Sequence, residues 1–259
     1  SDVYKRQVIL CDETLRQRVA DGRGFPAAVT DAGMLPGIKV DTATAPLPGA
    51  PGETVTEGLD GLPARLAEYV GLGARFAKWR AVFTIADDRP SARAVRAGAH
   101  ALARYAVACQ EAGLVPVVEP EVLTEGAHGL DRCAAATTRV LAAVAGELAA
   151  SGADPAAMVL KPNMVTAGAG AVPVPPARVA RATVDTLCAT MPDDLAGVAF
   201  LSGGQSSSVA AANLAAIRAR SAPWPLTFSF GRALVSPALQ AWHGDPAAVP
   251  AALSLIHIS

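Results

Sequence analysis

Short apolar runs alternate along the chain with longer amphipathic stretches, and this alternation restricts the possible folds more than any other feature of the sequence. We predict strands at seven runs, residues 8–12, 37–41, 75–82, 115–119, 158–161, 197–201 and 226–230. We predict helices at residues 57–70, 91–112, 129–150, 176–190 and 206–220, with a last helix from about residue 232. Strands that alternate with helices in this way indicate βαβ units and a parallel sheet.

The predicted fold is α/β, a (β/α)8 TIM barrel truncated to about seven β/α units. A chain of 259 residues is long enough for one such domain, which we expect over residues 8–252. A closed barrel of this type has eight strands, so we interpret one leading β/α unit as missing. Residues 46–52 are rich in Pro and Gly and are expected to form a loop, not a domain boundary. Residues 1–7 and 254–259 do not continue the neighbouring patterns, and we interpret them as non-native ends.

Charge and composition exclude several classes of protein. The net charge is −1 and no basic stripe is present, which argues against a nucleic-acid partner. No secretory signal opens the chain and no apolar run approaches the roughly 18 residues of a membrane span, so no membrane association is expected. The four cysteines are scattered, as in a reduced, cytoplasmic protein. The four histidines form no cluster, so no metal site is expected.

Lysine is rare in this chain. Of the 22 basic residues only Lys5, Lys39, Lys78 and Lys161 are lysines, and the last three lie inside or at the end of apolar strand-like runs. Burying an ammonium group costs about 2 kcal/mol or more unless the group is paired or loses its proton. A lysine can become a nucleophilic amine, whereas an arginine is permanently charged. These three lysines are therefore candidates for chemistry.

The ends of four successive strands carry most of the candidate site. Lys39 and Asp41 end one strand, the pair Lys78 and Arg80 the next, Glu119 and Glu121 a third, and Lys161 a fourth. Side chains alternate along a strand, so residues two apart face the same way. Because chemistry in parallel α/β folds gathers at the carboxyl ends of the strands, we expect these groups to meet.

Two later loops predict an anion site. The sequence "LSGGQS" follows the strand at 197–201 and opens a helix, where glycines and free N–H groups suit a phosphate. The last strand is followed by Ser229, Gly231 and Arg232, and a guanidinium can bind phosphate in a bidentate manner. An amine nucleophile, a carboxylate and a phosphate site together indicate Schiff-base carbon–carbon chemistry on a phosphorylated ketose.

At this point the motifs are recognisable. The stretches "GIKVD", "FAKWR", "VPVVEPE", "LKPNMVT", "FLSGGQS" and "LTFSFGRAL" occur in this order over roughly residues 8–243. The chain resembles class I, Schiff-base fructose-bisphosphate aldolase. The resemblance implies reversible cleavage of fructose 1,6-bisphosphate into dihydroxyacetone phosphate and glyceraldehyde 3-phosphate, without metal or cofactor. It also implies a cytoplasmic enzyme of glycolysis, tetrameric in the full-length form.

The resemblance implies a role for each matching residue. Lys161 would be the Schiff-base lysine, and Glu119 the acid/base that dehydrates the carbinolamine. Glu121 would support Glu119, while Lys78 would assist proton transfer and keep Lys161 partly unprotonated. Substrate hydroxyls and phosphates would be bound by a further set of residues: Lys39, Arg80, Ser202, Gly203, Ser229, Gly231 and Arg232.

Three departures from the family pattern limit the prediction. The family's first strand carries an aspartate that takes part in bond cleavage, and that segment is not found here, nor is the family's mobile C-terminal tail. Phe230 stands where many relatives have tyrosine. We therefore expect at most weak activity from this 259-residue chain. Two other functions stay open: another lysine-dependent aldolase or transaldolase, and an inactive scaffold.

Overall fold

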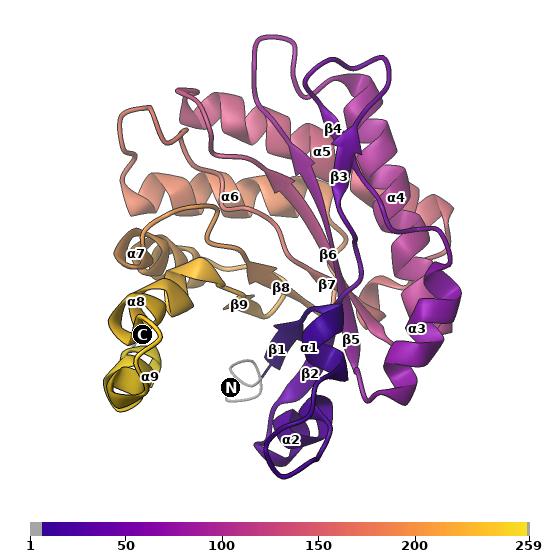
Figure 1. Cartoon of the computed structure of the whole chain (residues 1–259). Coiled ribbons are helices and arrows are strands. Elements are labelled where there is room, and N and C mark those ends of the chain that lie inside the picture. The colour runs from indigo at the N-terminus through magenta and orange to yellow at the C-terminus, as the bar shows by residue number, and fades with distance from the viewer. Residues whose placement is uncertain (1–6, 258–259) are drawn as a thin grey trace.

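The chain folds around a curled sheet of seven parallel strands (Figure 1). The computed structural model describes residues 7–257, without the side chains of Arg232, Ile256 and His257. The strands are hydrogen-bonded in the order β1 (Gln7–Leu10), β2 (Leu35–Lys39), β5 (Phe76–Phe83), β6 (Val115–Val122), β7 (Val159–Leu160), β8 (Gly197–Phe200) and β9 (Leu226–Phe228). All seven predicted strands are present, and the half-barrel confirms the predicted truncated (β/α)8 fold.

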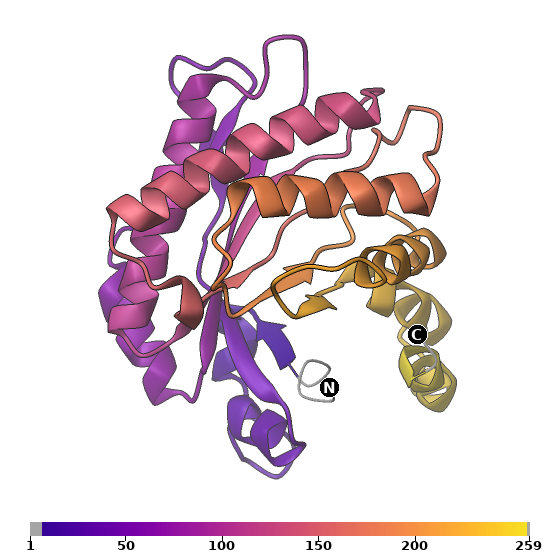
Figure 2. The same cartoon turned by 180° about the vertical axis from the view of Figure 1, so that it is seen from behind.

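Helices cover the outer face of the sheet one after another (Figure 2). They are α3 (Leu62–Gly71), α4 (Ala92–Glu111), α5 (Leu130–Ala150), α6 (Pro176–Thr190), α7 (Ser207–Arg218) and α8 (Arg232–Trp242). Their ends follow local signals. The Ser91 hydroxyl accepts a hydrogen bond from the N–H of Ala94 and so caps α4, and Ser206 caps α7 in the same way. The helix predicted from Glu57 begins only at Leu62.

The missed elements are short. Helices α1 (Asp12–Arg16) and α2 (Phe25–Asp31) lie between β1 and β2, and α9 (Val249–His257) follows α8. Two 3₁₀ helices span Pro155–Ala157 and Pro246–Ala248. The loop predicted at residues 46–52 is the turn of an antiparallel hairpin, whose strands β3 (Thr44–Pro46) and β4 (Thr54–Thr56) were not predicted. Each of these strands has only three residues, too few for a periodic pattern.

Part of the core lies where α4 packs on β5 and β6. Trp79 and Tyr105 are fully buried and their rings lie 5.6 Å apart. The Tyr105 hydroxyl donates to the Ala77 carbonyl at 2.7 Å and accepts from the Val117 N–H at 3.1 Å. Its hydroxyl therefore joins the two strands that carry most of the candidate site.

Helix α5 is, by length and composition, apolar enough to cross a membrane; it is the one such helix among the described residues. In this structure α5 packs against α4, α6 and β6. Its buried side chains, among them Val140, Leu141 and Val144, belong to the core of the barrel wall. A helix that packs on the outside of the sheet can thus be as long and as apolar as a membrane-spanning helix.

Candidate active site

The parallel alignment of β2, β5, β6 and β7 brings the predicted lysines and carboxylates together. Lys39 is the last residue of β2, Lys78 lies within β5, Glu119 lies within β6, and Lys161 follows β7 directly. The register pairs Lys39 with Lys78, and Arg80 with Glu119. The Lys161 N–H donates to the Val118 carbonyl at 2.7 Å, which fixes the lysine backbone against β6.

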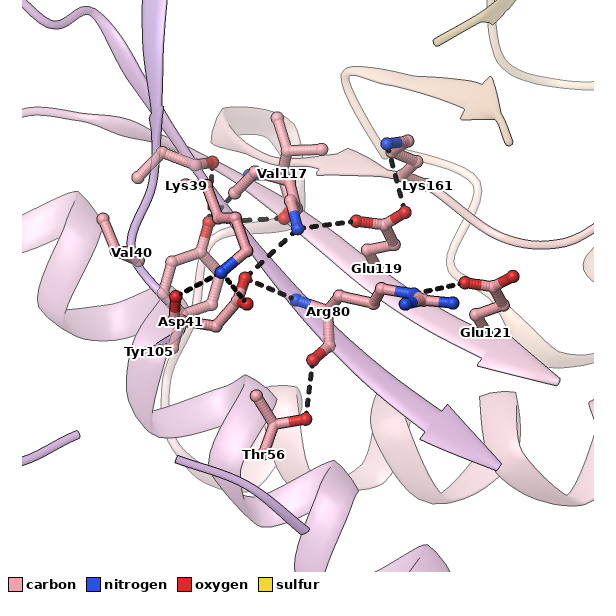
Figure 3. Close-up of polar contacts among 12 residues, drawn as sticks. Lys39, Val40, Asp41, Thr56, Arg80, Tyr105, Val117, Glu119, Glu121 and Lys161 are labelled. Atoms are coloured by element: carbon pink, nitrogen blue, oxygen red, sulfur yellow. Dashed lines mark hydrogen bonds and ion pairs between the residues drawn. The ribbon is translucent and has the colours of Figure 1, made fainter. Parts of the chain in front are cut away.

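Three lysines and two carboxylates form one chain of ion pairs (Figure 3). The Asp41 carboxylate lies between two amines, 2.7 Å from Lys39 Nζ and 3.1 Å from Lys78 Nζ. Glu119 continues the chain, 3.2 Å from Lys78 Nζ and 3.1 Å from Lys161 Nζ. The side chains of Lys78, Lys161, Asp41 and Glu119 are at most 10% exposed. Each buried charge therefore has a partner, as such burial requires.

A second ion pair lies beside this chain. The Arg80 guanidinium donates to a Glu121 carboxylate oxygen, while the Arg80 N–H donates to Asp41 Oδ2 at 3.2 Å. Thr56 of the hairpin donates its hydroxyl to the Arg80 carbonyl at 2.7 Å. Burial opposes the charge of Arg80, but its hydrogen bond and attraction to Glu121 outweigh this and raise the pKa of the guanidinium. Glu121 thus has Arg80 as its ion-pair partner, not a lysine.

The charge balance of the cluster favours an anionic ligand. Lys39, Lys78 and Lys161 face two carboxylates, Asp41 and Glu119, and the Arg80–Glu121 pair is neutral as a unit. One positive charge is therefore left over. Lys39 and Arg80 are also the open members of the cluster, with side chains 40% and 42% exposed. An incoming phosphate would meet these two cations first.

The loop after β8 offers backbone donors. Gly203 and Gly204 have positive φ angles of 57° and 80°, which bend the chain sharply between Ser202 and the start of α7. Within residues 7–257, the N–H groups of Ser202, Gly203 and Gly204 have no acceptor. Such a row of free N–H groups in a turn is typical of an anion-binding site.

The residues predicted after β9 lie next to this loop. The Ser229 N–H donates to the Phe200 carbonyl at 2.9 Å, which holds the end of β9 against β8, and Gly231 precedes the first turn of α8. The backbone of Arg232 begins α8, but its side chain lies outside the described part, so its predicted contact with phosphate stays a prediction.

The predicted set of site residues left out two buried groups. Asp41 was noted beside Lys39 but given no role, although its spacing of two residues placed both side chains on one face of the strand. Asn163, two residues after Lys161, is 2% exposed. It accepts from the Val122 N–H at 3.0 Å and donates to the Met164 carbonyl at 3.1 Å, so it fixes the turn after the lysine. In the sequence, the one feature that marks Asn163 is that it is a polar residue within an apolar run.

Comparisons with known proteins show the family of this chain. The family model described as fructose-bisphosphate aldolase class-I matches residues 3–257. A cytoplasmic fructose-bisphosphate aldolase of Pisum sativum is 50% identical over 96% of this chain and 70% of the relative. A probable class 1 aldolase of Xanthomonas campestris is 48% identical over 93% of this chain and 73% of the relative.

A solved structure gives the same answer for the fold. The fructose-bisphosphate aldolase of Plasmodium falciparum superposes with a TM-score of 0.94 at 42% identity, covering 96% of this chain and 73% of that structure. The resemblance predicted from the motifs is thus confirmed over nearly the whole sequence. The chain belongs to the class I fructose-bisphosphate aldolase family.

Proposed function

We propose that Lys161 forms the Schiff base through which this chain cleaves fructose 1,6-bisphosphate into dihydroxyacetone phosphate and glyceraldehyde 3-phosphate. The observation that carries the assignment is the buried contact of 3.1 Å between Nζ of Lys161, directly after β7, and Oε1 of Glu119, within β6. Glu119 is 4% exposed, so its carboxylate faces the two amines of the site and not bulk water. Lys161 is the amine nearest the loop that follows β8, because the Leu201 N–H bonds the carbonyl of Pro162.

The proposed reaction uses these groups in order. Glu119 takes the proton that Lys161 gives up, and the unprotonated Lys161 amine then adds to the C2 ketone. Glu119 returns this proton to the carbinolamine hydroxyl, which leaves as water. The resulting iminium accepts the electron pair of the C3–C4 bond as that bond breaks. The C4 hydroxyl gives up its proton to a base while the C4 carbonyl forms, and glyceraldehyde 3-phosphate leaves. Protonation of the enamine and hydrolysis then release dihydroxyacetone phosphate and free Lys161.

Lys78 links the two carboxylates of the cluster and is proposed to relay protons. Its amine lies 3.1 Å from Asp41 and 3.2 Å from Glu119. A proton that leaves Glu119 can therefore move toward Asp41 without crossing bulk water. Glu121, paired with Arg80, is proposed to orient that guanidinium toward substrate instead of transferring protons itself.

Two phosphate positions are proposed. The N–H groups of Ser202 and Gly203, with Ser229, Gly231 and Arg232, would hold the phosphate beside the reacting ketone. Lys39 and Arg80 lie at the opposite side of the cluster from the β8 and β9 loops and would attract the second phosphate. Arginine and lysine suit phosphate because their donors match its oxygens.

Borohydride trapping tests the lysine assignment. Treating the chain with dihydroxyacetone phosphate and borohydride should reduce the iminium to a stable secondary amine, found on Lys161 by peptide mass mapping. The Lys161→Arg variant keeps a positive charge but should take no label. A label on Lys39 or Lys78 in the unsubstituted chain, or an undiminished label in Lys161→Arg, would overturn the assignment. Because the iminium is the electron sink, cleavage should be insensitive to chelators.

Compartment and assembly complete the proposal. Relatives from pea, spinach and Arabidopsis are named cytoplasmic or cytosolic isozymes, and we assign the same compartment to this chain. We further propose that residues 8–252 form one barrel domain and that the full-length parent is a homotetramer, as the family resemblance implies. Sedimentation velocity of the full-length parent measures the second point, and a monomer at micromolar concentration would contradict it.

A further inference from the structure

Two amide side chains, a buried one on α7 and a half-buried one in the loop that follows β8, join that helix to the loop. Asn213, 3% exposed on α7, donates its Nδ2 to Gln205 Oε1 at 2.6 Å. Gln205 in turn donates its Nε2 to the Ser202 carbonyl at 2.8 Å and contacts Met164 Sδ at 3.6 Å. Met164 lies three residues after Lys161. The two amides therefore connect the loop with free N–H groups to the segment that carries the lysine.

These contacts constrain the loop from one side, and Thr124 constrains it from the other. The Gln205 N–H also donates to the Ser202 carbonyl, at 3.1 Å. The Thr124 hydroxyl donates to the Gly203 carbonyl at 2.7 Å. Both carbonyls are thus engaged, and the N–H groups of the same peptides are left without an acceptor in the described structure. Fixing the carbonyl of a peptide fixes the direction of the neighbouring N–H, because the peptide unit is planar.

Helix packing alone does not account for Asn213. A buried amide is costly unless its polar atoms are hydrogen-bonded, and an apolar residue of similar size would fill the same space. Asn213 Oδ1 has no partner within residues 7–257. The side chain lines a cavity of about 200 Å³ between α6, α7 and the loops, which Thr166 and Gln205 also line. Among the described residues, the one hydrogen bond of the Asn213 side chain is directed at Gln205.

We propose that Gln205 and Asn213 are positioning residues for phosphate: they orient the loop from Ser202 to Gly204 so that its N–H groups face the ligand. Asn213 orients Gln205, and Gln205 holds the loop. The inference rests on the proposed Schiff-base function, and it concerns binding of the phosphate, not the chemistry at Lys161. Weakening these amide contacts should therefore raise the concentration of ligand needed without removing the nucleophile.

The test is a titration of borohydride trapping with dihydroxyacetone phosphate. In Gln205→Met and Asn213→Leu, which keep side-chain volume but lose the amide, half-maximal labelling should need about fivefold to tenfold more ligand, as expected for one lost hydrogen bond. At saturating ligand, labelling of Lys161 should reach the level of the unsubstituted chain. Inorganic phosphate, added as competitor, should inhibit labelling less effectively in both variants.

Two controls separate positioning from general destabilisation. Gln110→Met removes a glutamine amide that bonds the Asp154 backbone far from the site, and Leu214→Ala weakens core packing on α7 beside Asn213. Both should leave the ligand concentration for half-maximal labelling unchanged. The same shift in Leu214→Ala as in Asn213→Leu would assign the effect to helix packing and overturn the proposal.

The double variant tests whether Asn213 acts through Gln205. If it does, Gln205→Met with Asn213→Leu should bind no more weakly than Gln205→Met alone. If the factors by which the two single variants weaken ligand binding multiply in the double variant, Asn213 does not act through Gln205. Failure of the unsubstituted chain to label at Lys161 would overturn the proposed function instead, whereas normal labelling with unchanged titrations in both variants would overturn this inference alone.

Discussion

Glu119 holds two amines with its two carboxylate oxygens, and this sharing defines its place in the site. Oε1 lies 3.1 Å from Lys161 and Oε2 lies 3.2 Å from Lys78. Glu121, two residues along the same strand, pairs with Arg80 instead. Two glutamates of one motif therefore have different neighbours, and they should respond differently to the same substitution.

Replacing Glu119 by Gln should slow formation of the trapped adduct by about 10²- to 10⁴-fold, the usual contribution of a general acid or base. The amide keeps the volume and one acceptor oxygen, but it carries no charge and cannot exchange the proton. Glu121→Gln is the matched control and should slow labelling far less, because Glu121 contacts no lysine of the site. Rates of borohydride labelling at saturating ligand measure both. Equal losses in the two variants would contradict the distinct role of Glu119.

The sequence predicts which charged residues belong to the site better than it predicts their ion-pair partners. The meeting of Lys39, Lys78 and Lys161 was predicted from the alternation of strands and helices, although Lys78 lies within β5 and not at its end. The partners depend on register, which a single sequence does not fix: Arg80 lies opposite Glu119 in the ladder, yet its guanidinium reaches Glu121. The sharing of Asp41 by two lysines depends on the same register and was missed.

Helix α4 shows how tertiary contact overrides intrinsic propensity at the scale of an element. Gly98 lies in its interior, where alanine would ordinarily be favoured by up to about 1 kcal/mol. A Cβ at Gly98 would lie 2.7 Å from Cζ of Phe83 on β5, closer than real contacts allow. Gly146 in α5 is a matched position with nothing within 4 Å of its would-be Cβ.

Alanine at these two glycines should therefore have opposite effects. Gly98→Ala should lower the free energy of unfolding by about 1–3 kcal/mol, since helix and strand must move apart. Gly146→Ala should raise it by about 0.5–1 kcal/mol, the gain in helix propensity. Urea unfolding followed by circular dichroism measures both. Stabilisation by Gly98→Ala would show that α4 does not pack this closely on β5.

Helix α4 also buries Cys109 and Tyr105 in the core. Because both groups can lose a proton, the free energy of unfolding should depend on pH. Burial raises the pKa of the Cys109 thiol from 9.0 to about 12, although its hydrogen bond with Tyr105 partly opposes the rise. Burial also raises the pKa of Tyr105 well above 10.0. The unfolded chain gives up the thiol proton first, so this contribution to stability is complete below pH 9 and is lost from pH 9 to about pH 12.

Cys109→Ala should flatten the alkaline loss of stability. Between pH 9 and 10, before Tyr105 contributes, the slope of the unfolding free energy should be shallower than in the unsubstituted chain, by at most about 1.4 kcal/mol per pH unit. Cys11→Ala removes an exposed thiol whose hydrogen bond with Thr14 lowers its pKa, and it is the control, expected not to flatten the slope. Urea unfolding under reducing conditions at several pH values measures this. Identical slopes in Cys109→Ala would place the thiol in contact with solvent.

Element length decided which parts of the fold could be predicted. Helices such as α4, α5 and α6 span four to six turns of periodic sequence and were predicted within one or two residues. The β3–β4 hairpin was missed because three residues per strand give no alternation, and its turn resembles an ordinary Pro/Gly loop. The hairpin matters to the site, since Thr56 holds the Arg80 backbone.

At the scale of the whole molecule, pairing in the sheet is strongest at one side. Strands β5 and β6 are each eight residues long and pair along their full length, whereas β7 has two residues and β9 three. Within the described residues β1 and β9 are the edges of the sheet, each with one neighbour. The sequence predicted the number of strands and their parallel direction, but not this uneven pairing, because strand length depends on the neighbour.

Local stability should follow this gradient. Regions with few buried apolar contacts and short ladders open with little cost, while central strands open only with global unfolding. Around β9, the helices α8 and α9 expose Leu239, Trp242 and Leu253, so little apolar surface is buried there. The β8–β9 side, which carries the proposed phosphate loops, should thus open more readily than the β5–β6 side, which carries Lys78 and Glu119.

Hydrogen exchange followed by mass spectrometry measures this directly. Amides of β5 and β6 should exchange slowest, and those of β9, α8 and α9 should exchange at least about tenfold faster, which corresponds to a difference of about 1.4 kcal/mol in opening free energy. Trapping the dihydroxyacetone phosphate adduct on Lys161 should slow exchange in the loops after β8 and β9 and leave α4 and α5 unchanged. If β9 exchanges as slowly as β5 in the free chain, the sheet opens as one unit, and phosphate would then bind to loops that are already rigid.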